Sequence, residues 1–340
     1  MKEGQAAIID LFQDHFGFLP SRVDALTPSG SARLYYRLTH PSGKTFIGTL
    51  STQREENEAF IGFSSQLRRA GVNVPEVYCA NLSNGVYIQE DLGDHSLYNL
   101  LDDTSEKGLE NRLQGFKQAI DLLLKVQVNG SNYIDYNLCF PVHELDRNNV
   151  LWDLNYFKYY FIKLYDLPID ENALEEEFNQ FAKELVEAGP SGFLVRDFQS
   201  RNIMIKGGKS YLIDFQSGRK GPIYYDLVSL LWQAKAQLSD EEKSQLQHYY
   251  FSKASGPMGL NLADFQADYM RFVLFRTLQV LGAYGLRGVV QRKPHFLSSI
   301  PLAIKNLKSL ASKKEFFPKL DNLWNAFSHY LNHVYDENEF

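Results

Sequence analysis

The sequence predicts an α+β fold with two lobes: a small strand-rich lobe over residues 1–92 with a leading helix, and a larger helical lobe over residues 93–340. Short strand candidates separated by turns run to about residue 90, and long segments with helical periodicity follow them. A chain of 340 residues, 44% of them hydrophobic, also has enough apolar material to bury two cores.

The N-terminal lobe is expected to begin with an amphipathic helix over residues 5–16, where Ile8, Leu11 and Phe12 recur at helical spacing. Gly71 ends a second predicted helix. A turn joins two strand candidates into a hairpin, and two short strands complete the lobe. The hairpin strands, the second helix and the short strands are expected at residues 33–39, 45–50, 55–70, 77–78 and 85–89.

The C-terminal lobe is expected to be mainly helical. Ser239 and Glu242 form a capping box that predicts the start of one helix. Residues 89–94 combine charge with glycine after a buried strand, which favours a hinge between the lobes. Further helices are expected at 109–128, 171–187, 224–236 and 264–284, and short strands at 193–195, 203–205 and 211–213.

Composition argues against several classes of protein. The net charge of -6 and an isoelectric point near 5.8 argue against binding to nucleic acid. Cys79 and Cys139 lie far apart without a C-x-x-C pair, so neither a disulfide framework nor a thiolate zinc site is predicted. The sequence shows no signal peptide and no apolar span of membrane length. We therefore expect a cytoplasmic protein with no nucleic-acid or membrane partner.

The strongest chemical signal is the spacing D-x-x-x-x-N from Asp197 to Asn202, followed by Asp214 at the end of a later strand candidate. Phosphoryl transfer needs one carboxylate to accept a hydrogen bond from the attacking hydroxyl. It also needs hard oxygen ligands, here Asn202 and Asp214, to hold Mg²⁺ against a triphosphate. Alone, these residues would be turn residues and a strand cap; the strands around them and the turn at Gly207 and Gly208 favour catalysis.

This segment resembles the aminoglycoside phosphotransferase and choline kinase superfamily, relatives of the protein kinases. Arg196 precedes Asp197 as in eukaryotic protein kinases, and Gly221 and Pro222 open a segment that leads to Asp226 as in the superfamily. The resemblance implies a protein-kinase-like fold, ATP and Mg²⁺ as cofactors, and supporting roles for Arg196 and Asp226. Asp226 would brace the catalytic loop from behind. Taken alone, it would be an acidic residue favoured at a helix N-terminus.

Within the superfamily, the likeness is greatest to the bacterial N-acetylmuramate/N-acetylglucosamine anomeric kinases. Gln216 follows Asp214 and Phe215 where protein kinases have glycine, as in that group. The resemblance implies an N-acetylated amino sugar as acceptor, phosphorylated at its anomeric hydroxyl during peptidoglycan recycling. The similar stretches are residues 30–37, 89–94, 214–218 and 275–284, within a region from about 28 to about 305 that excludes 129–170.

Nucleotide contacts are expected at two places in the N-terminal lobe. The loop of Ser29, Gly30 and Ser31 is small enough for its backbone N–H groups to approach a phosphate, although such a loop in isolation would more often be a plain turn. In the hinge, backbone groups of Glu90 and Leu92 are expected to meet adenine.

One departure concerns the phosphate-binding cation. Protein kinases place a lysine on the third strand, but residues 46–50 contain none, and Lys44 lies at the wrong end of that strand. Arg33 or Arg37 could supply the charge instead, and either could equally belong to a solvated strand face. Arg33 is our candidate.

Such an arginine needs a carboxylate to hold it. Glu58, central in the helix expected at 55–70, is our candidate, with Glu55 and Glu56 as alternatives. All three could also lie on a solvated helix face.

The leading hypothesis is an ATP-dependent kinase that phosphorylates a hydroxyl of a small sugar. One alternative keeps the reaction with an aminoglycoside, choline or another amino alcohol, for which Glu144, Asp146 and Asp153 could provide negative charge. Another is a nucleotide-binding pseudokinase, because the third-strand lysine is missing. The aromatic run at 156–161 could stack on a sugar, although its spacing also suits a buried helix. The sequence does not predict the oligomeric state.

Overall fold

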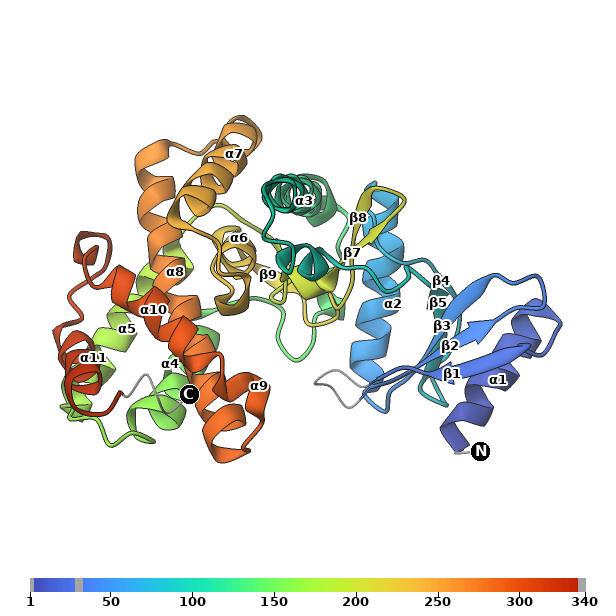
Figure 1. Ribbon diagram of the computed structural model, residues 1–340, viewed down its shortest axis with the longest axis horizontal. Helices are drawn as coiled ribbons and strands as arrows, with labels where there is room; N and C mark the ends of the chain where they lie inside the picture. The colour runs from blue at the N-terminus through green and yellow to red at the C-terminus, as the bar shows by residue number, and fades with distance from the viewer. Residues whose placement is uncertain (1–2, 28–32, 336–340) are drawn as a thin grey trace. The chain divides into compact units, whose positions relative to one another are not determined.

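The computed structural model describes residues 3–27 and 33–335. The architecture is mixed α+β, as predicted, with a five-stranded sheet near the N-terminus and mostly helices toward the C-terminus (Figure 1). The chain forms two compact units: the first is Met1–His143 with Val195–Arg219, and the second is Glu144–Leu194 with Lys220–Phe340. The chain thus returns to the first unit just before the predicted catalytic residues. The lobe boundary expected after residue 92 stays a prediction.

The first unit contains an antiparallel sheet with the strand order β1-β2-β3-β5-β4. In its middle, β2 pairs Leu34 with Leu50 of β3, and β3 pairs Phe46 with Glu90 of β5. The strands are β1 (Arg22–Ala25), β2 (Leu34–Thr39), β3 (Thr45–Leu50), β4 (Val77–Asn81) and β5 (Val86–Glu90).

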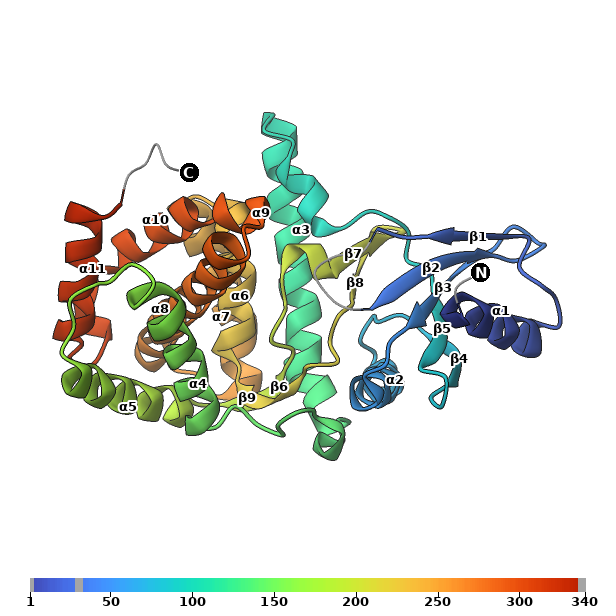
Figure 2. The same ribbon diagram turned by 90° about the horizontal axis from the view of Figure 1, so that it is seen from below.

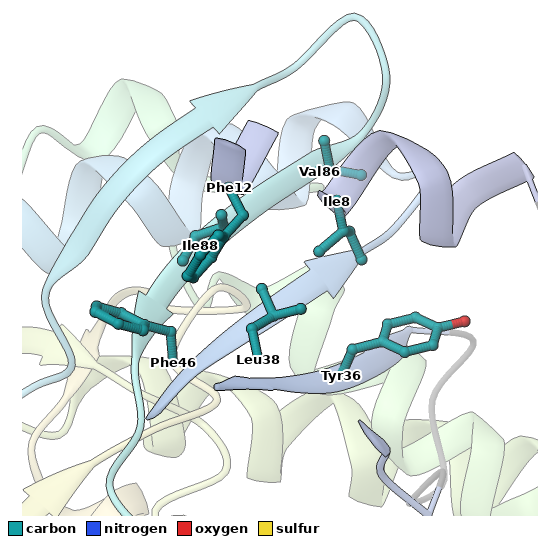
Figure 3. Packing of buried hydrophobic residues seen from close by; sticks show 7 residues of the cluster. All are labelled: Ile8, Phe12, Tyr36, Leu38, Phe46, Val86 and Ile88. Atoms are coloured by element: carbon teal, nitrogen blue, oxygen red, sulfur yellow. The ribbon is translucent and has the colours of Figure 1, made fainter. Parts of the chain in front are cut away.

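One face of this sheet is covered by α1 (Glu3–Phe16), because Ile8 and Phe12 lie one helical turn apart and both point at the strands. Side chains alternate across each strand, so every second residue joins the same core. Figure 3 shows the cluster, which consists of Ile8, Phe12, Tyr36, Leu38, Phe46, Val86 and Ile88.

The opposite face of the sheet carries the intervening residues and faces α2 (Arg54–Arg69), so that α1 and α2 lie on different sides of the sheet (Figures 1 and 2). Phe60 of α2 stacks on Tyr87 at 5.2 Å and on Phe215 at 4.6 Å between ring centroids. This face is therefore partly apolar and partly polar. Its central residues are Tyr35, Arg37, Ile47, Thr49, Tyr87 and Gln89.

A hairpin of β7 (Ile203–Lys206) and β8 (Lys209–Leu212) also belongs to the first unit. Gly207 and Gly208 both have positive φ angles, 56° and 72°, which suits a two-residue hairpin turn. The hairpin packs against α3 (Glu106–Leu124) and hydrogen-bonds to the loop after α2 through Asn73. It places Asn202 and Asp214 at its two open ends.

The second unit is built around α8, against which α4, α6 and α10 pack (Figure 1). Two strands, β6 (Ser191–Leu194) and β9 (Arg219–Pro222), form a separate small sheet. The helices are α4 (Arg147–Phe157), α5 (Glu171–Glu187), α6 (Tyr224–Leu231), α7 (Asp240–Met258), α8 (Leu262–Tyr284), α9 (Pro294–Leu297), α10 (Ile300–Leu310) and α11 (Asp321–His333).

Several predicted elements are confirmed. Helix α5 spans the expected residues, and the capping box of α7 is present: Ser239 Oγ accepts from the Glu242 backbone at 3.2 Å, and Glu242 Oε2 accepts from the Ser239 backbone at 2.7 Å. The helix expected at 224–236 is shorter, because it ends at Leu231. Among the described helices, none has the length and apolar character that a bilayer crossing needs.

Candidate active site

The predicted catalytic loop follows β6 and is held in an unusual backbone conformation. Arg196 adopts a left-handed conformation, with φ of 77°, and Asp197 follows with an exposed side chain. Such conformations cost about 1–3 kcal/mol in non-glycine residues and concentrate at functional sites. Asn202 closes the loop, since its Nδ2 donates to the backbone oxygen of Asp197 at 2.9 Å. This bond orients the amide, which leaves Asn202 Oδ1 as the atom that can bind a cation.

Asp214 lies next to this loop, because the backbone N–H of Ile213 donates to the Asn202 carbonyl at 2.9 Å. Its own φ of 61° is left-handed, as is that of Arg196 just before Asp197, so the backbone is strained at two points of the site. Asp214 Oδ1 accepts from Gln216 Nε2 at 2.7 Å, and Oδ2 accepts from Asn202 Nδ2 at 3.3 Å. The structure thus brings Asp197, Asn202 and Asp214 together.

The surroundings of Asp214 disfavour its ionised form. Burial raises the pKa of Asp214, and the nearby Asp197 carboxylate raises that pKa further. The Gln216 hydrogen bond and the charge of Arg33 act in the opposite direction but do not cancel these effects. A cation at this point would relieve the repulsion between the two carboxylates.

The donor set fits Mg²⁺. Asn202 and Asp214 offer an amide oxygen and a carboxylate, the hard ligands that this ion prefers. Within residues 3–27 and 33–335, no group of three or more acidic, histidine or cysteine side chains could form a complete cage. The two residues would therefore hold Mg²⁺ together with water and phosphate oxygens, as is usual for kinases.

A cavity of about 270 Å³ lies in the first unit beside Asn202 and Asp214. Its walls are largely apolar, and the hinge residues 89–94 form one edge. Among the described residues, no hydrogen bond uses the backbone N–H or C=O of Leu92, which lines this edge. The apolar walls are formed by Leu26, Ile47, Phe60, Pro75, Leu92, Met204 and Ile213.

Salt bridges fix the shape of the hinge. Lys206 Nζ binds Glu90 Oε1 at 2.7 Å and the backbone oxygen of Asp91 at 2.9 Å. Arg37 Nε binds Asp91 Oδ2 at 2.6 Å, and Arg37 Nη2 binds Asp94 Oδ1 at 2.8 Å. Arg37, one of the two candidate phosphate cations, is thus engaged with the carboxylates of the hinge.

Arg33 is the other candidate, and it is 4% exposed at the start of β2. Its Nη2 binds Glu56 Oε2 at 2.9 Å, and its Nη1 donates to the Tyr87 hydroxyl at 3.0 Å. The choice of Glu58 as its anchor is wrong: Glu58 pairs with Arg54 of the same helix at 2.9 Å. Positions 56 and 58 differ by about 200° around the helix, so only one of them can face the sheet.

Other predicted site residues are less informative. Ser29, Gly30 and Ser31 lie outside the described residues. Asp226 belongs to the second unit, where it is fully buried in the first turn of α6. Its supporting role, like that of Arg196, stays a prediction.

The sequence interpretation missed the side chains that support Arg33 and Asp214. Tyr87 accepts a hydrogen bond from Arg33, and Gln216 donates one to Asp214. Asp91 forms a salt bridge with Arg37. Strand alternation puts Tyr87 on the same face of the sheet as Arg33, because Tyr35, two residues after Arg33, and Tyr87 both lie opposite Thr49 of β3. The contact of Asp91 with Arg37 reaches across β3 and has no local signal in the sequence.

Comparison with known proteins identifies the family. The family model described as the phosphotransferase enzyme family matches residues 26–260. The chain belongs to this family. The matched region includes the sheet from β2 onward, the hinge, the cavity and all three predicted catalytic and metal-binding residues. The protein is therefore a kinase that acts on a small molecule.

The similar proteins are named for different acceptor molecules. An N-acetylmuramate/N-acetylglucosamine kinase from Pseudomonas aeruginosa is 22% identical over 312 residues, which cover 89% of this chain and 88% of the relative. A choline kinase structure from Streptococcus pneumoniae has a TM-score of 0.57 at 15% identity, covering 90% of this chain and 99% of that one.

A thermostable mutant of an aminoglycoside phosphotransferase, solved in ternary complex with AMP-PNP and hygromycin B, has a TM-score of 0.56 at 12% identity. The match covers 88% of this chain and 98% of the mutant's chain. The likeness to choline kinase and aminoglycoside phosphotransferase structures confirms the predicted fold, whereas it does not select an acceptor.

Proposed function

We propose that this kinase transfers the γ-phosphoryl group of ATP to the anomeric hydroxyl of an N-acetylated amino sugar such as N-acetylmuramate or N-acetylglucosamine. The observation that carries the reaction is the cluster of Asp197, Asn202 and Asp214 beside a cavity with a hinge edge. The observation that favours the acceptor is the relative named for these two sugars, which aligns with 89% of the chain.

Each residue has a role that its position supports. The exposed Asp197 carboxylate accepts a hydrogen bond from the acceptor hydroxyl and takes its proton as the new oxygen–phosphorus bond forms and the bond to the β-phosphate oxygen breaks. Asn202 and Asp214 hold Mg²⁺, which neutralises charge on the phosphates. The buried Arg33, held by Glu56 and Tyr87, takes the place of the missing third-strand lysine.

The nucleotide is proposed to lie in the cavity. Leu92 has backbone groups without partners among the described residues, so they can bond to adenine. Glu90 lies two residues earlier at the same edge; its N–H donates to the Glu76 carbonyl at 2.8 Å, so its proposed contribution is the carbonyl oxygen. The loop of Ser29, Gly30 and Ser31, outside the described residues, is proposed to contact the phosphates. Arg196 and Asp226 are proposed to support the catalytic loop.

The contacts of the acidic residues that favoured a cationic acceptor also support the proposed acceptor. Glu144 pairs with Lys220 at 3.9 Å, and Asp146 caps α4 by accepting from the backbone of Asn149 at 2.8 Å. Two of the three carboxylates thus make a salt bridge or a helix cap within the second unit. A neutral or acidic sugar does not need them.

The biological setting follows from the acceptor. A kinase of these sugars would act in peptidoglycan recycling, and ATP is available in the cytoplasm. Cys79 and Cys139 are both free thiols, which suits that reducing compartment.

The test is ADP release from the purified chain with Mg²⁺ and ATP across N-acetylmuramate, N-acetylglucosamine, kanamycin and choline. The proposal predicts turnover with the two amino sugars, and loss of that turnover in Asp197→Asn. Turnover with kanamycin or choline alone would keep the kinase and reject the proposed acceptor. Tight nucleotide binding without turnover on a wide acceptor panel would instead favour the pseudokinase alternative.

A further inference from the structure

The segment from Tyr269 to Lys314 in the second unit contains no aspartate or glutamate, although the whole chain has a net charge of -6. Its charged side chains are all arginines and lysines. The family match ends at residue 260, whereas the alignment with the Pseudomonas aeruginosa relative named for the two amino sugars covers 89% of the chain and so extends past that point. A positive segment beyond the part common to the family is a place where an acceptor with negative charge can be recognised.

Within this segment, Arg287 is an exposed cation that an aromatic ring holds in place. It lies in the π-helical turn Gly285–Val290, and the central carbon of its guanidinium is 5.3 Å from the ring centroid of Phe296 in α9. π-Helical turns are rare and occur frequently at functional sites. Stacking on a ring occupies one flat face of the guanidinium, which leaves its N–H edge for a ligand.

The backbone around Arg287 fixes this stack. Gly288 lies so close to α9 that a Cβ atom there would come within 2.8 Å of the Leu297 backbone nitrogen. The Lys293 N–H donates to the Arg287 carbonyl at 3.0 Å, which closes the loop between the turn and α9. The cation and its ring therefore belong to one tightly folded piece of chain.

The charge of Arg287 is not neutralised within the part of the chain that the structure describes. Arg287 makes no salt bridge there, and neither do Arg292 and Lys293 of the same loop. Arg276, earlier in the segment, is by contrast buried and donates to the Tyr225 hydroxyl at 3.1 Å. A held guanidinium with an open N–H edge can bind a carboxylate through two parallel hydrogen bonds.

We propose that Arg287 binds the carboxylate of N-acetylmuramate and that Phe296 positions the guanidinium for it. This inference rests on the proposed function, because it takes the acceptor to be one of the two amino sugars. N-acetylmuramate carries a lactyl ether with one carboxylate, whereas N-acetylglucosamine has a hydroxyl group at that position and is neutral. Arg287 is therefore a specificity-determining residue that favours the acidic sugar.

The experiment measures kcat/KM of the full chain for N-acetylmuramate, its uncharged carboxamide and N-acetylglucosamine, and the calorimetric affinity for the first two. The carboxamide has nearly the size of the acid and lacks its charge. Wild type is expected to favour the acid over the carboxamide by about 10-fold or more in both measurements.

Arg287→Gln, which removes the charge, should lower kcat/KM for the acid by about 10- to 100-fold more than that for N-acetylglucosamine. Arg287→Lys should recover only part of this loss, because an ammonium group lacks the two-pronged geometry. Phe296→Leu should raise KM for the acid more than it lowers kcat, as expected for a residue that positions the cation.

Arg292→Gln is the matched control, because it makes the same substitution at an exposed arginine of the same loop. It should change kcat/KM for each sugar by less than about 2-fold. Equal use of the acid and the carboxamide by wild type, or equal losses for acid and neutral sugar in Arg287→Gln, would overturn the inference while leaving the kinase proposal intact. If Arg287→Gln does not fold, the comparison of acid and carboxamide in wild type decides. Phosphorylation of neither sugar by wild type would reject the proposed function, and this inference with it.

Discussion

At the scale of single residues, Asp197 and Asp214 are two carboxylates in different surroundings, which fits the different roles proposed for them. Asp197 is exposed on a loop whose preceding residue is left-handed, which leaves it free to meet a substrate hydroxyl. Asp214 is buried, and burial together with the Asp197 charge raises its pKa. Pairs of acids in such different environments usually divide catalysis between them.

Asp197→Asn is expected to lower kcat by about 10²- to 10⁴-fold, because it removes the proton acceptor and its orientation. The affinity for Mg·AMP-PNP should stay nearly unchanged, since Asn202 and Asp214 still hold the metal. Stopped assays of turnover and calorimetry of nucleotide binding measure the two effects separately. A parallel fall in both would make Asp197 a binding residue.

Asp214→Asn is expected to abolish metal-dependent turnover and to stabilise the nucleotide-free protein. The folded-state pKa of Asp214 is raised, so its contribution to stability is present at low pH and is lost as pH rises from the ordinary carboxylate range through that raised pKa. The melting temperature of wild type should therefore fall relative to that of the variant as the pH rises above about 4.

Calorimetric scans across this range provide the measurement. Added Mg·AMP-PNP should raise the melting temperature of wild type more than that of Asp214→Asn, because only wild type retains the metal ligand. Identical pH profiles for the two proteins would show that folding does not raise the pKa of Asp214.

At the scale of elements, the proposed phosphate-binding cation is held by a contact between the residue before β2 and α2. Arg33 immediately precedes β2, and Glu56, in the first turns of α2, is the acid that reaches it. The sequence predicted both elements and listed Glu56 only as an alternative, because helical periodicity over a charged segment does not show which side faces the sheet. Strand alternation, which is strict, identifies the cavity-facing residues more reliably.

Glu56→Gln is expected to lower kcat/KM for ATP by about 10-fold or more, because Arg33 loses the charge that orients it. Glu58→Gln is the matched control: the same substitution, one half-turn away, in a pair with Arg54 on the exposed side of the helix. It should change kcat/KM by less than about 2-fold. Equal effects of the two substitutions would contradict the assignment of Arg33 and Glu56.

A second element-level contact concerns the second unit, where the π-helical turn Gly285–Val290 packs against another at Lys158–Ile162. A Cβ atom on Gly285 would overlap the carbonyl oxygen of Tyr160. Gly285→Ala is therefore expected to lower the free energy of unfolding by about 1–3 kcal/mol or more.

Gly256→Ala is its control, since nothing lies within 4 Å of a Cβ atom there and the residue is inside α7. That substitution should be neutral or stabilising by up to about 1 kcal/mol. Urea denaturation of both variants measures the difference. A Gly285→Ala variant as stable as wild type would show that these turns separate at little cost.

At the scale of the whole molecule, the predicted catalytic residues belong to a unit that the chain leaves and re-enters. The first unit ends at His143 and resumes at Val195. Asp197 therefore belongs to the same unit as the five-stranded sheet, although a long segment of the second unit separates them in the sequence. The local spacing of Asp197, Asn202 and Asp214 predicted their cluster, because one hairpin brings Asn202 and Asp214 together and the loop of Asp197 leads directly into it. Arg37 with Asp91 and Lys206 with Glu90 could not be predicted in this way, since only the folded chain brings those residues together.

The second unit was predicted less completely. The helices with long periodic patterns were predicted, whereas α4, α10 and α11 were not. The aromatic run at 156–161 is partly a buried helix face and partly exposed: Phe157 and Phe161 are buried, and Tyr159 is 62% exposed. The acceptor is the part of the account that local patterns constrain least.

The measurement that tests the central claim most directly is ³¹P NMR of the reaction product formed from ATP and N-acetylmuramate or N-acetylglucosamine, with kanamycin as a parallel acceptor. The account predicts a new sugar phosphate signal coupled to the anomeric proton, present with wild type and absent with Asp197→Asn. A phosphate signal with kanamycin alone, or a sugar phosphate coupled to a proton other than the anomeric one, would contradict it.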